Sequence, residues 1–277
     1  MLFSILVVSL NPGDKLLQTL QSIEKQTCRD YEVIIKDGGS TDGSMETAKQ
    51  YKSILGERLR IVQKEDKGIY DAMNQAVLKA AGEYVYFLNC GDRFYSEQVL
   101  AHMEKLIRER QGEEKVPSIY YGNIYERVTG QEVCSNPRLD GFGCYRNVPC
   151  HQACFYERQL LLQHPFETVY RVRADYEQFL WCYFRAGAKL VYDKLLIADY
   201  EGGGFSETRE NRKRSQREHK EITEKYMTGK ELFRYRLILA VTLSSLRTRL
   251  SRNKWTAGIY NKGKEFLYKR SGDKIEK

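Results

Sequence analysis

Short apolar runs alternate with amphipathic stretches through the first third of the chain. The apolar runs lie at residues 4–10, 31–36, 59–64 and 83–89. The amphipathic stretches between them lie at residues 14–26, 42–55 and 69–81. Strands that alternate with helices in this way form βαβ units and a parallel sheet. We therefore predict an α/β fold with a Rossmann-like, mostly parallel sheet flanked by helices.

After Asp92 the alternation gives way to a mixture of predicted strands, loops and helices. From residue 207 onward the sequence is charged and helical in composition. We predict a core domain made of two halves, followed by a basic C-terminal helical extension. These three parts are residues 1–115, 116–206 and 207–277.

The composition is that of a folded protein in a reducing compartment. Apolar residues make up 42% of the 277 positions, which is enough for a sizeable core. The seven cysteines are an odd number without the regular spacing of a secreted disulfide scaffold. The first apolar run lacks a basic start and a cleavage site, so we predict a strand there rather than an export signal. These features favour a cytoplasmic protein.

Positive charge is concentrated toward the C-terminus. The formal net charge is +8, and residues 201–277 hold 20 Lys and Arg against 10 Asp and Glu. The segment 232–246 is interrupted by Arg234 and Arg236 and is shorter than the about 20 apolar residues that span a bilayer. We predict an interfacial helix on an anionic membrane. The alternative is an amphipathic helix packed on the protein's own core.

Polar residues follow each predicted strand at its carboxyl end. They are Ser9 and Asn11, Asp37, Asp66, and the run from Asn89 to Asp92. In open α/β sheets, ligands bind in the crevice at this edge. Thr41 and Asp42 come just before the second helix, and we expect at least one of them to cap it.

Two acidic strand exits suit a nucleoside diphosphate held together with a metal ion. One carboxylate accepts hydrogen bonds from a base or a ribose, and another holds a divalent cation that neutralises the diphosphate. The GxGxxG fingerprint and the GxxxxGK[ST] loop are both absent from the sequence. Their absence disfavours a nicotinamide enzyme and a P-loop NTPase.

Three strings carry a family resemblance. They are SILVVSLN with the following LLQTLQSIEKQT, then DYEVIIKDGGSTDGS, and then EDKGIYDAMNQAVLKAAGEYVYFLNCGD. In this order and spacing, residues 3–92 resemble the nucleotide-sugar-binding half of family 2 glycosyltransferases with the GT-A fold. The resemblance implies that residues 1–115 bind a nucleotide sugar, with a UDP-sugar as the favoured donor. Residues 116–206 would then bind the acceptor.

The resemblance also assigns roles to the residues around the donor. Asp37 would bind the nucleobase, Asp66 would lie against the nucleoside, and the nucleoside pocket would be lined by Ser9 and Asn11. Two polar residues of the next helix share one side because they are three positions apart. We expect these two residues either to contact the donor sugar or to form a solvated helix face. They are Asp71 and Asn74.

Asp92 would close the metal-binding DxD-type motif of the family. The sequence departs from the family here, because Asn89 stands where the first acidic residue is usual. Metal binding then rests on Asp92, with phosphate oxygens and waters completing the shell of Mg²⁺ or Mn²⁺ and with Asn89 beside the donor. Cys90 is disfavoured as a ligand because these ions prefer oxygen. The departure leaves open a catalytically silent nucleotide-sugar or membrane-binding module of the same fold.

Asp175 is the predicted general base. It precedes an apolar helix pattern, so from the residue alone a helix cap is the alternative. The acceptor half of the family carries a similar block, which implies that Asp175 takes the proton of the acceptor hydroxyl. Without a covalent intermediate, transfer proceeds by single displacement with inversion.

Two further segments adjoin the predicted site. His151 and Gln152 resemble a segment of the family and are expected to border the diphosphate or the acceptor. A three-glycine bend is followed by Ser206, Arg209 and Arg212. This stretch is expected either to close on the diphosphate as a loop or to form a flexible link into the tail.

These features together predict a metal-dependent, inverting glycosyltransferase of the hexosyltransferase type. The acceptor is expected to be a glycan or a polyprenyl-linked saccharide in bacterial surface polysaccharide assembly. The basic tail favours a peripheral position on the cytoplasmic face of the cell membrane. We expect no nucleic-acid binding, because the basic residues accompany no recognisable motif or aromatic array.

Overall fold

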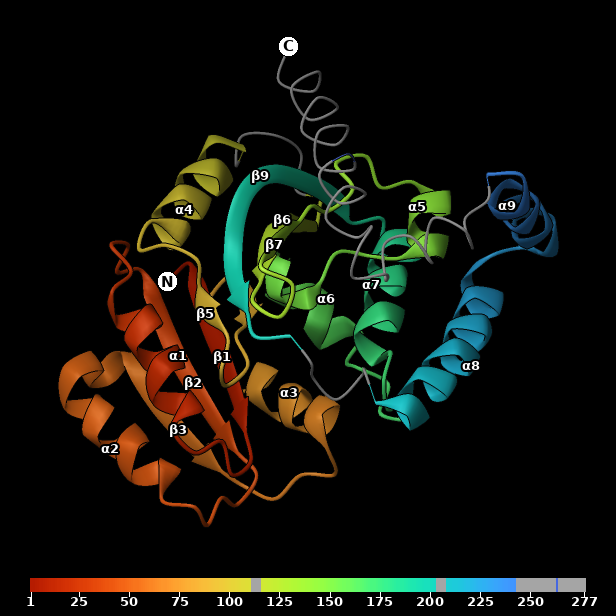
Figure 1. Ribbon diagram of the computed structural model, residues 1–277. Coiled ribbons are helices and arrows are strands. Elements are labelled where there is room, and N and C mark those ends of the chain that lie inside the picture. The colour runs from red at the N-terminus through yellow and green to blue at the C-terminus, as the bar shows by residue number, and fades with distance from the viewer. Residues whose placement is uncertain (111–115, 203–207, 243–262, 264–277) are drawn as a thin grey trace.

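The chain folds around one curled sheet, which has nine strands in the part that the structure describes (Figure 1). The computed structural model describes residues 1–110, 116–202, 208–242 and 263. The strand order is β3-β2-β1-β4-β8-β6-β9-β5, and β7 pairs with β6. The strands are β1 (Phe3–Ser9), β2 (Tyr31–Asp37), β3 (Leu59–Gln63), β4 (Tyr84–Phe87), β5 (Arg93–Phe94), β6 (Ser118–Glu126), β7 (Gln131–Val133), β8 (Cys154–Glu157) and β9 (Lys189–Tyr200).

Helices cover both faces of this sheet (Figure 1). One face carries α1 (Lys15–Glu24), α2 (Ser44–Leu55) and α4 (Val99–Arg110). The other face carries α3 (Ile69–Val77), α6 (Arg158–Gln163) and α7 (Ala174–Phe184). Outside this second layer lie α5 (Gly141–Arg146), α8 (Arg209–Tyr226) and α9 (Gly229–Val241).

The first four strands confirm the predicted parallel arrangement. β1 pairs in parallel with β2 and with β4, and β2 pairs in parallel with β3. The chain therefore winds outward from β1 to β3 and then returns to the other side of β1. A sheet that changes direction in this way opens a crevice at the carboxyl ends of the two strands that flank the change. Here those strands are β1 and β4.

The burial pattern of β1 shows why the sequence run is apolar throughout. Ile5 and Val7 point into the core beneath α1, α2 and α4, whereas Leu6 and Val8 point into the core beneath α3. A strand covered on both faces loses the polar alternation of a half-exposed strand. Each large apolar side chain buried in this way contributes about 1.5–3 kcal/mol. The sheet therefore forms the centre of two packed layers.

The second half of the sheet is mixed. β8 pairs antiparallel with both β4 and β6, and β9 pairs in parallel with β6 from Lys189 to Tyr200. β9 then curves across the sheet, and its far end pairs antiparallel with β5 (Figure 1). This curvature brings the end of β9, at Tyr200, back to the segment that follows β4. The sheet continues through β4 and β8, which belong to the two predicted halves of the core domain.

The C-terminal helices pack on the core with one face and leave the other exposed. Leu232 and Tyr235 of α9 are buried, whereas three apolar residues at four-residue spacing are exposed. The exposed residues are Phe233, Leu237 and Val241. The buried face confirms the alternative of a helix packed on the protein's own core, as far as residue 242. The interfacial helix on a membrane stays a prediction, and residues 243–246 lie outside the described part. Within that part no helix is long and apolar enough to cross a bilayer.

The predicted loop or flexible link between β9 and α8 is wrong from residue 209 onward, because α8 begins there. Ser206 lies outside the described residues. Arg209 is the first residue of α8, and Arg212 lies exposed in the first turn of the same helix. The side chain of Thr208 accepts a hydrogen bond from the N–H of Asn211 and caps α8.

Candidate active site

Hydrogen bonds tie the exits of β1 and β2 together. The N–H of Gly38 donates to the carbonyl of Ser9 at 2.9 Å. The N–H of Asn11 donates to Ser40 Oγ, and the N–H of Thr41 donates to Asn11 Oδ1, both at 2.8 Å. Asn11 has a φ of 48°, in the left-handed region that Asn tolerates better than most residues. The structure thus brings Ser9 and Asn11 to the turn that follows Asp37.

The start of α2 is organised by Asp42. Its Oδ1 accepts hydrogen bonds from the N–H and the hydroxyl of Ser44, at 3.1 and 2.6 Å. Its Oδ2 accepts from the N–H of Gly13 at 2.7 Å. The N-cap position itself is Gly43, which has no side chain to accept a bond. Asp42 therefore holds both the helix start and the loop after β1.

Asp37 is fully buried beneath this turn. Its Oδ1 accepts from the hydroxyl of Ser40 at 2.5 Å, and its Oδ2 accepts from the N–H groups of Gly39 and Ser40 at 3.1 and 3.0 Å. Burial raises the pKa of this carboxyl, but the hydrogen bonds from Ser40 and Gly39 outweigh it and lower the pKa below its usual value. Asp37 is therefore an ionised group that shapes the turn. Its contact with a nucleobase stays a prediction.

Asp66 is held in place by a buried lysine. The ammonium of Lys36 donates to Asp66 Oδ2 at 2.7 Å and to the carbonyl of Lys64 at 2.6 Å, and its side chain is fully buried. A Cβ atom on Gly38 would lie 2.8 Å from the same carboxylate oxygen. Any side chain at position 38 would therefore push Asp66 away. The structure places Asp66 directly against the turn after β2, and its contact with a nucleoside stays a prediction.

The turn from Asn89 to Asp92 is fastened to α1 by Thr19. The Thr19 hydroxyl donates to the carbonyl of Asp92 at 2.8 Å and accepts from the N–H of Gly91 at 3.0 Å. The N–H of Asp92 donates to the carbonyl of Asn89 at 3.0 Å. This turn begins soon after β4 ends at Phe87, so the strand is shorter than the predicted run 83–89.

The carboxylate of Asp92 is buried between two segments from the second half of the chain. Its Oδ1 accepts from the N–H of Glu201 at 2.9 Å, and its Oδ2 accepts from the side chain of Gln152 at 2.9 Å. Burial raises the pKa of Asp92 above its usual value, and these two hydrogen bonds offset only part of that effect. The site therefore favours a nearby positive charge.

Asp175 lies in the first turn of α7, with 28% of its side chain exposed. Its Oδ1 accepts from the hydroxyl of Tyr70 and from the N–H of Tyr176, both at 2.9 Å. Its Oδ2 lies 3.4 Å from Nδ1 of His151. Burial raises the pKa of Asp175, but the interactions with His151 and Tyr70 outweigh it and lower the pKa below its usual value. Asp175 is therefore ionised at neutral pH, which is the state that accepts a proton.

His151 connects this carboxylate to the turn after β4. Its Nε2 lies 3.1 Å from Nδ2 of Asn89, while its Nδ1 faces Asp175. An imidazole that accepts from the Asn89 amide at Nε2 carries its proton on Nδ1 and donates it to Asp175. Together with the contact between Gln152 and Asp92, this brings the predicted base and the predicted metal turn into one site.

Asp71 and Asn74 are engaged in holding α3. Asp71 Oδ2 accepts from the N–H of Lys67 at 2.9 Å, at the start of the helix. The amide of Asn74 donates to the carbonyl of Phe166 and accepts from its N–H, both at 2.9 Å. These bonds give both residues a structural role. Their contact with a donor sugar stays a prediction.

The structure adds four residues to this site that sequence reasoning did not single out. Tyr70 and Thr19 stand within strings that carry the family resemblance, but neither has a chemical signature of its own. Lys36 stands in an apolar run and looked like part of a strand. Glu201 also joins the site, 109 residues after the Asp92 that it contacts. No local pattern in the sequence reports a contact of that length.

The residues around Asp92 fit a small, hard cation. Oδ1 of Asn89 is buried and has no hydrogen-bond partner. The nearby carboxylate and amide oxygens are the donor types that Mg²⁺ and Mn²⁺ prefer. Burial raises the pKa of the Cys90 thiol to about 12, so it stays protonated and is a poor ligand. Asp92 and Asn89 are therefore the residues that would hold the ion.

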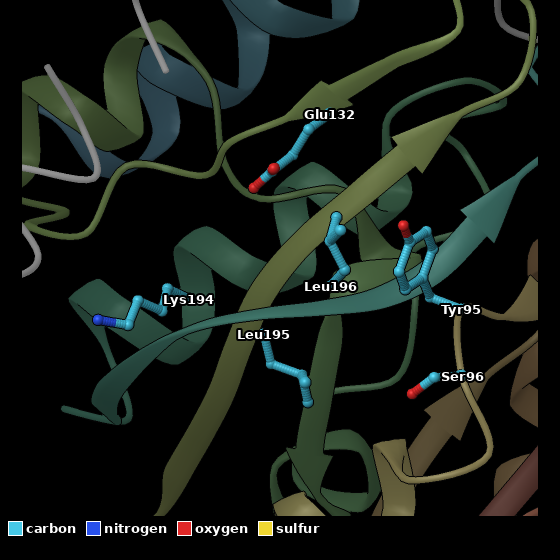
Figure 2. Close-up of a pocket in the computed structure, with 6 residues that line it drawn as sticks. All are labelled: Tyr95, Ser96, Glu132, Lys194, Leu195 and Leu196. Atoms are coloured by element: carbon cyan, nitrogen blue, oxygen red, sulfur yellow. The ribbon is translucent and has the colours of Figure 1, made fainter. Parts of the chain in front are cut away.

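Two other features do not involve the strand-exit residues. His164, Glu167 and Glu177 form a group with metal-ligand chemistry, but the ammonium of Lys225 already lies 2.6 Å from Glu167 and 2.7 Å from Glu177. An open hollow near β9 is lined by none of the strand-exit residues (Figure 2). Its lining consists of Tyr95, Ser96, Glu132, Lys194, Leu195 and Leu196.

Solved structures show the class of fold. The chain resembles the S. aureus TarS 1-349 structure in complex with UDP-GlcNAc, with a TM-score of 0.64 and 19% identity over 81% of this chain and 67% of that one. It also resembles the mannosyltransferase PcManGT from Pyrobaculum calidifontis in complex with GDP-Man and Mn²⁺, with a TM-score of 0.56 and 18% identity over 77% and 60% of the two chains. The curled sheet and its flanking helices define a GT-A fold.

Sequence relatives show the family. Residues 4–161 match the family described as "Glycosyl transferase family 2". A "PGL/p-HBAD biosynthesis glycosyltransferase" of Mycobacterium bovis (strain BCG / Pasteur 1173P2) is 37% identical over 209 residues, which cover 75% of this chain and 80% of the relative. The chain belongs to glycosyltransferase family 2, as its three sequence strings predicted.

Proposed function

We propose that this chain is an inverting hexosyltransferase that uses a nucleoside diphosphate sugar, with a UDP-sugar as the favoured donor. The observation that carries the proposal is the connection from Asn89 through His151 to Asp175. Through His151, the ionised carboxylate of Asp175 lies near the turn after β4, where the donor diphosphate is expected. The solved structures with UDP-GlcNAc and GDP-Man support a nucleotide-sugar donor.

The reaction follows from the state of Asp175. Its carboxylate accepts the proton of an acceptor hydroxyl as the hydroxyl oxygen bonds to the anomeric carbon of the sugar. The bond from that carbon to the β-phosphate oxygen breaks, and the nucleoside diphosphate leaves with the electron pair. Attack opposite the leaving group inverts the anomeric configuration. Mg²⁺ or Mn²⁺ held by Asp92 would supply positive charge to the leaving diphosphate.

The two halves of the core domain have different roles, one in binding the donor and the other in binding the acceptor. Residues 1–115 bind the donor, with Asp37 and Asp66 at the nucleoside and Ser9 and Asn11 lining its pocket. Residues 116–206 supply Asp175 and bind the acceptor, which we take to be a glycan or a polyprenyl-linked saccharide. The names of the mycobacterial relatives, which place them in PGL/p-HBAD biosynthesis, support an acceptor of the cell-surface glycolipid or polysaccharide type.

Replacing the base tests the reaction directly. We expect Asp175→Asn to abolish sugar transfer and to leave the dissociation constant for UDP unchanged, because Asp175 acts on the acceptor. Asp193→Asn is a control, since this residue lies on β9 and pairs with His102. Transfer by the Asp175→Asn enzyme at the normal rate would contradict the assignment.

A panel of nucleotide sugars tests the silent-module alternative, which is favoured by the replacement of an acidic residue by Asn89. We expect EDTA-sensitive hydrolysis of one donor in the absence of acceptor. If no donor is hydrolysed and no sugar is transferred to any saccharide acceptor, the silent module is favoured.

We further propose that α9 holds the enzyme on the cytoplasmic face of the membrane. Phe233, Leu237 and Val241 form an exposed apolar stripe, and Arg234 and Arg236 lie between them in sequence. Apolar stripes with neighbouring basic residues bind anionic lipid surfaces. Flotation with anionic vesicles should recover the full chain but not a chain truncated after residue 206. Equal recovery of both would refute this attachment.

A further inference from the structure

The turn after β4 has fewer acidic side chains than a DxD-type motif requires. It reads Asn89-Cys90-Gly91-Asp92, so Asp92 is its only carboxylate. Gly91 has a φ of 98°, a left-handed conformation that favours glycine. A divalent cation bound by a single protein carboxylate would rely on phosphate oxygens and water for nearly all of its ligands. A second carboxylate near this turn would therefore change the affinity of the site.

The carboxylate of Glu201 lies beside Gly91, where the turn has no side chain of its own. A Cβ atom on Gly91 would lie only 2.6 Å from Oε2 of Glu201. The side chain of Glu201 therefore fills the space that a side chain at position 91 would take. Its backbone is also fixed to the turn, because the N–H of Glu201 donates to Asp92 Oδ1 at 2.9 Å. The curved end of β9 thus delivers an acidic group that the local sequence lacks.

We propose that Glu201 supplies the second carboxylate of the divalent cation site and binds Mg²⁺ or Mn²⁺ jointly with Asp92. The buried Oδ1 of Asn89, which has no hydrogen-bond partner, is the third oxygen donor at this turn. Hard oxygen donors of this kind suit both ions. The inference rests on the proposed function, since it concerns the ion that would accompany the donor diphosphate.

In the absence of a metal ion, the ammonium of Lys15 pairs with the carboxylate of Glu201. The ammonium lies 2.7 Å from Oε2 of Glu201, and the two side chains are 53% and 39% exposed. Exposed ion pairs contribute little stability, so a divalent ion can displace the ammonium at small cost. Lys15 then becomes free to meet the diphosphate. If Glu201 exchanges Lys15 for a metal ion, substitutions of Glu201 and of Lys15 should have opposite effects on metal binding.

The binding of Mn²⁺ to the full chain tests this inference without any measurement of activity. Electron paramagnetic resonance reports free Mn²⁺ during titrations of the protein alone and of the protein with UDP. We expect Glu201→Gln to weaken Mn²⁺ binding by about tenfold, because a charged ligand is lost. We expect Lys15→Gln to tighten binding of Mn²⁺ alone, because the competing ammonium is lost. Glu109→Gln removes a 61% exposed charge that pairs with Lys105 on α4, and it should leave binding unchanged.

Each outcome separates this inference from the proposed function. If wild-type protein binds Mn²⁺ and Glu201→Gln binds it equally well, Glu201 is no ligand, although the glycosyltransferase assignment stands. If Lys15→Gln and Glu201→Gln weaken binding alike, the pair only supports the turn and the inference is overturned. If wild-type protein with UDP binds no Mn²⁺, both the inference and the metal dependence of the proposed reaction fail. Thermal melts of each variant report whether the fold is intact.

Discussion

Tyr70→Phe removes one hydrogen bond from the predicted base and leaves the ring in place. The Tyr70 hydroxyl lies 2.9 Å from Oδ1 of Asp175, and burial raises its pKa well above the usual value, so it remains a donor at any working pH. The carboxylate keeps its contacts with His151 and with the N–H of Tyr176. The substitution also removes the contact of the same hydroxyl with the carbonyl of Val172, at 3.0 Å. That carbonyl does not titrate, so the pH-dependent part of the effect reports the donor to Asp175.

The size of the expected effect depends on the charge of Asp175, which accepts the hydrogen bond from Tyr70. A hydrogen bond to a charged group contributes about 1.5–3 kcal/mol, and one pKa unit corresponds to about 1.4 kcal/mol. Because 28% of the Asp175 side chain is exposed, we take the lower end of this range. The pKa of Asp175 should then rise, because the ionised form loses a donor. Stability should fall by about 1.5 kcal/mol at neutral pH.

The sign of the pH dependence is fixed by the lowered pKa of Asp175. The hydrogen bonds to the carboxylate add stability above the pKa of the unfolded carboxyl, and this contribution is lost as pH falls through the folded pKa. The destabilisation caused by Tyr70→Phe should therefore be largest at neutral pH and should shrink in acid. The acid limb of kcat/KM should move to higher pH, because the base becomes protonated sooner.

Initial rates across the acid range, together with urea unfolding at several pH values, measure both effects. Tyr121→Phe is a matched control, because its buried hydroxyl donates to the carbonyl of Asn136 and not to a carboxylate. The control should lose stability equally at all pH values and keep its acid limb. An unmoved acid limb in Tyr70→Phe, with normal rates, would refute the role of Asp175 as base.

Three further substitutions test other parts of the structure. Glu177→Gln should destabilise the fold by about 3 kcal/mol at neutral pH, because the buried carboxylate pairs with Lys225. This loss should shrink as pH falls, since the pKa of Glu177 is lowered, and unfolding at two pH values measures it. Asn74→Ala should cost about 2 kcal/mol in thermal or urea unfolding, because both backbone groups of Phe166 lose a partner. Phe233→Ser should reduce flotation with anionic vesicles at unchanged stability, since 71% of Phe233 is exposed.

The first half of the fold could be predicted from sequence because its signals are local. The apolar run that became β1 is followed by Asn11-Pro12-Gly13, and the run that became β2 is followed by a turn rich in Gly and Ser. These residues mark where strands end and helices begin. The mixed second half could not be predicted in the same way. β6 pairs with β8 and β9, which lie far away in the chain, and no periodicity in the sequence specifies such partners.

The site shows the same division between local and distant information. Asp37, Asp66 and Asp92 could be named because each follows an apolar run, and the carboxyl ends of parallel strands meet at one edge. Asp175 was selected by resemblance and by its place before an apolar helix pattern. Which groups surround these carboxylates was not accessible, because Tyr70, His151 and Glu201 approach them from other elements.

The sequence by itself determined the α/β class, the family and the acidic strand exits, since these depend on residue type and short-range spacing. Only the tertiary structure decided the electrostatic state of each carboxylate. Asp37 and Asp175 have lowered pKa values because hydrogen-bond donors surround them, whereas Asp92 has a raised pKa because burial dominates. The balance between burial and hydrogen bonding is set by which distant segments pack together, and the curve of β9, which places Glu201 against Gly91, is one example.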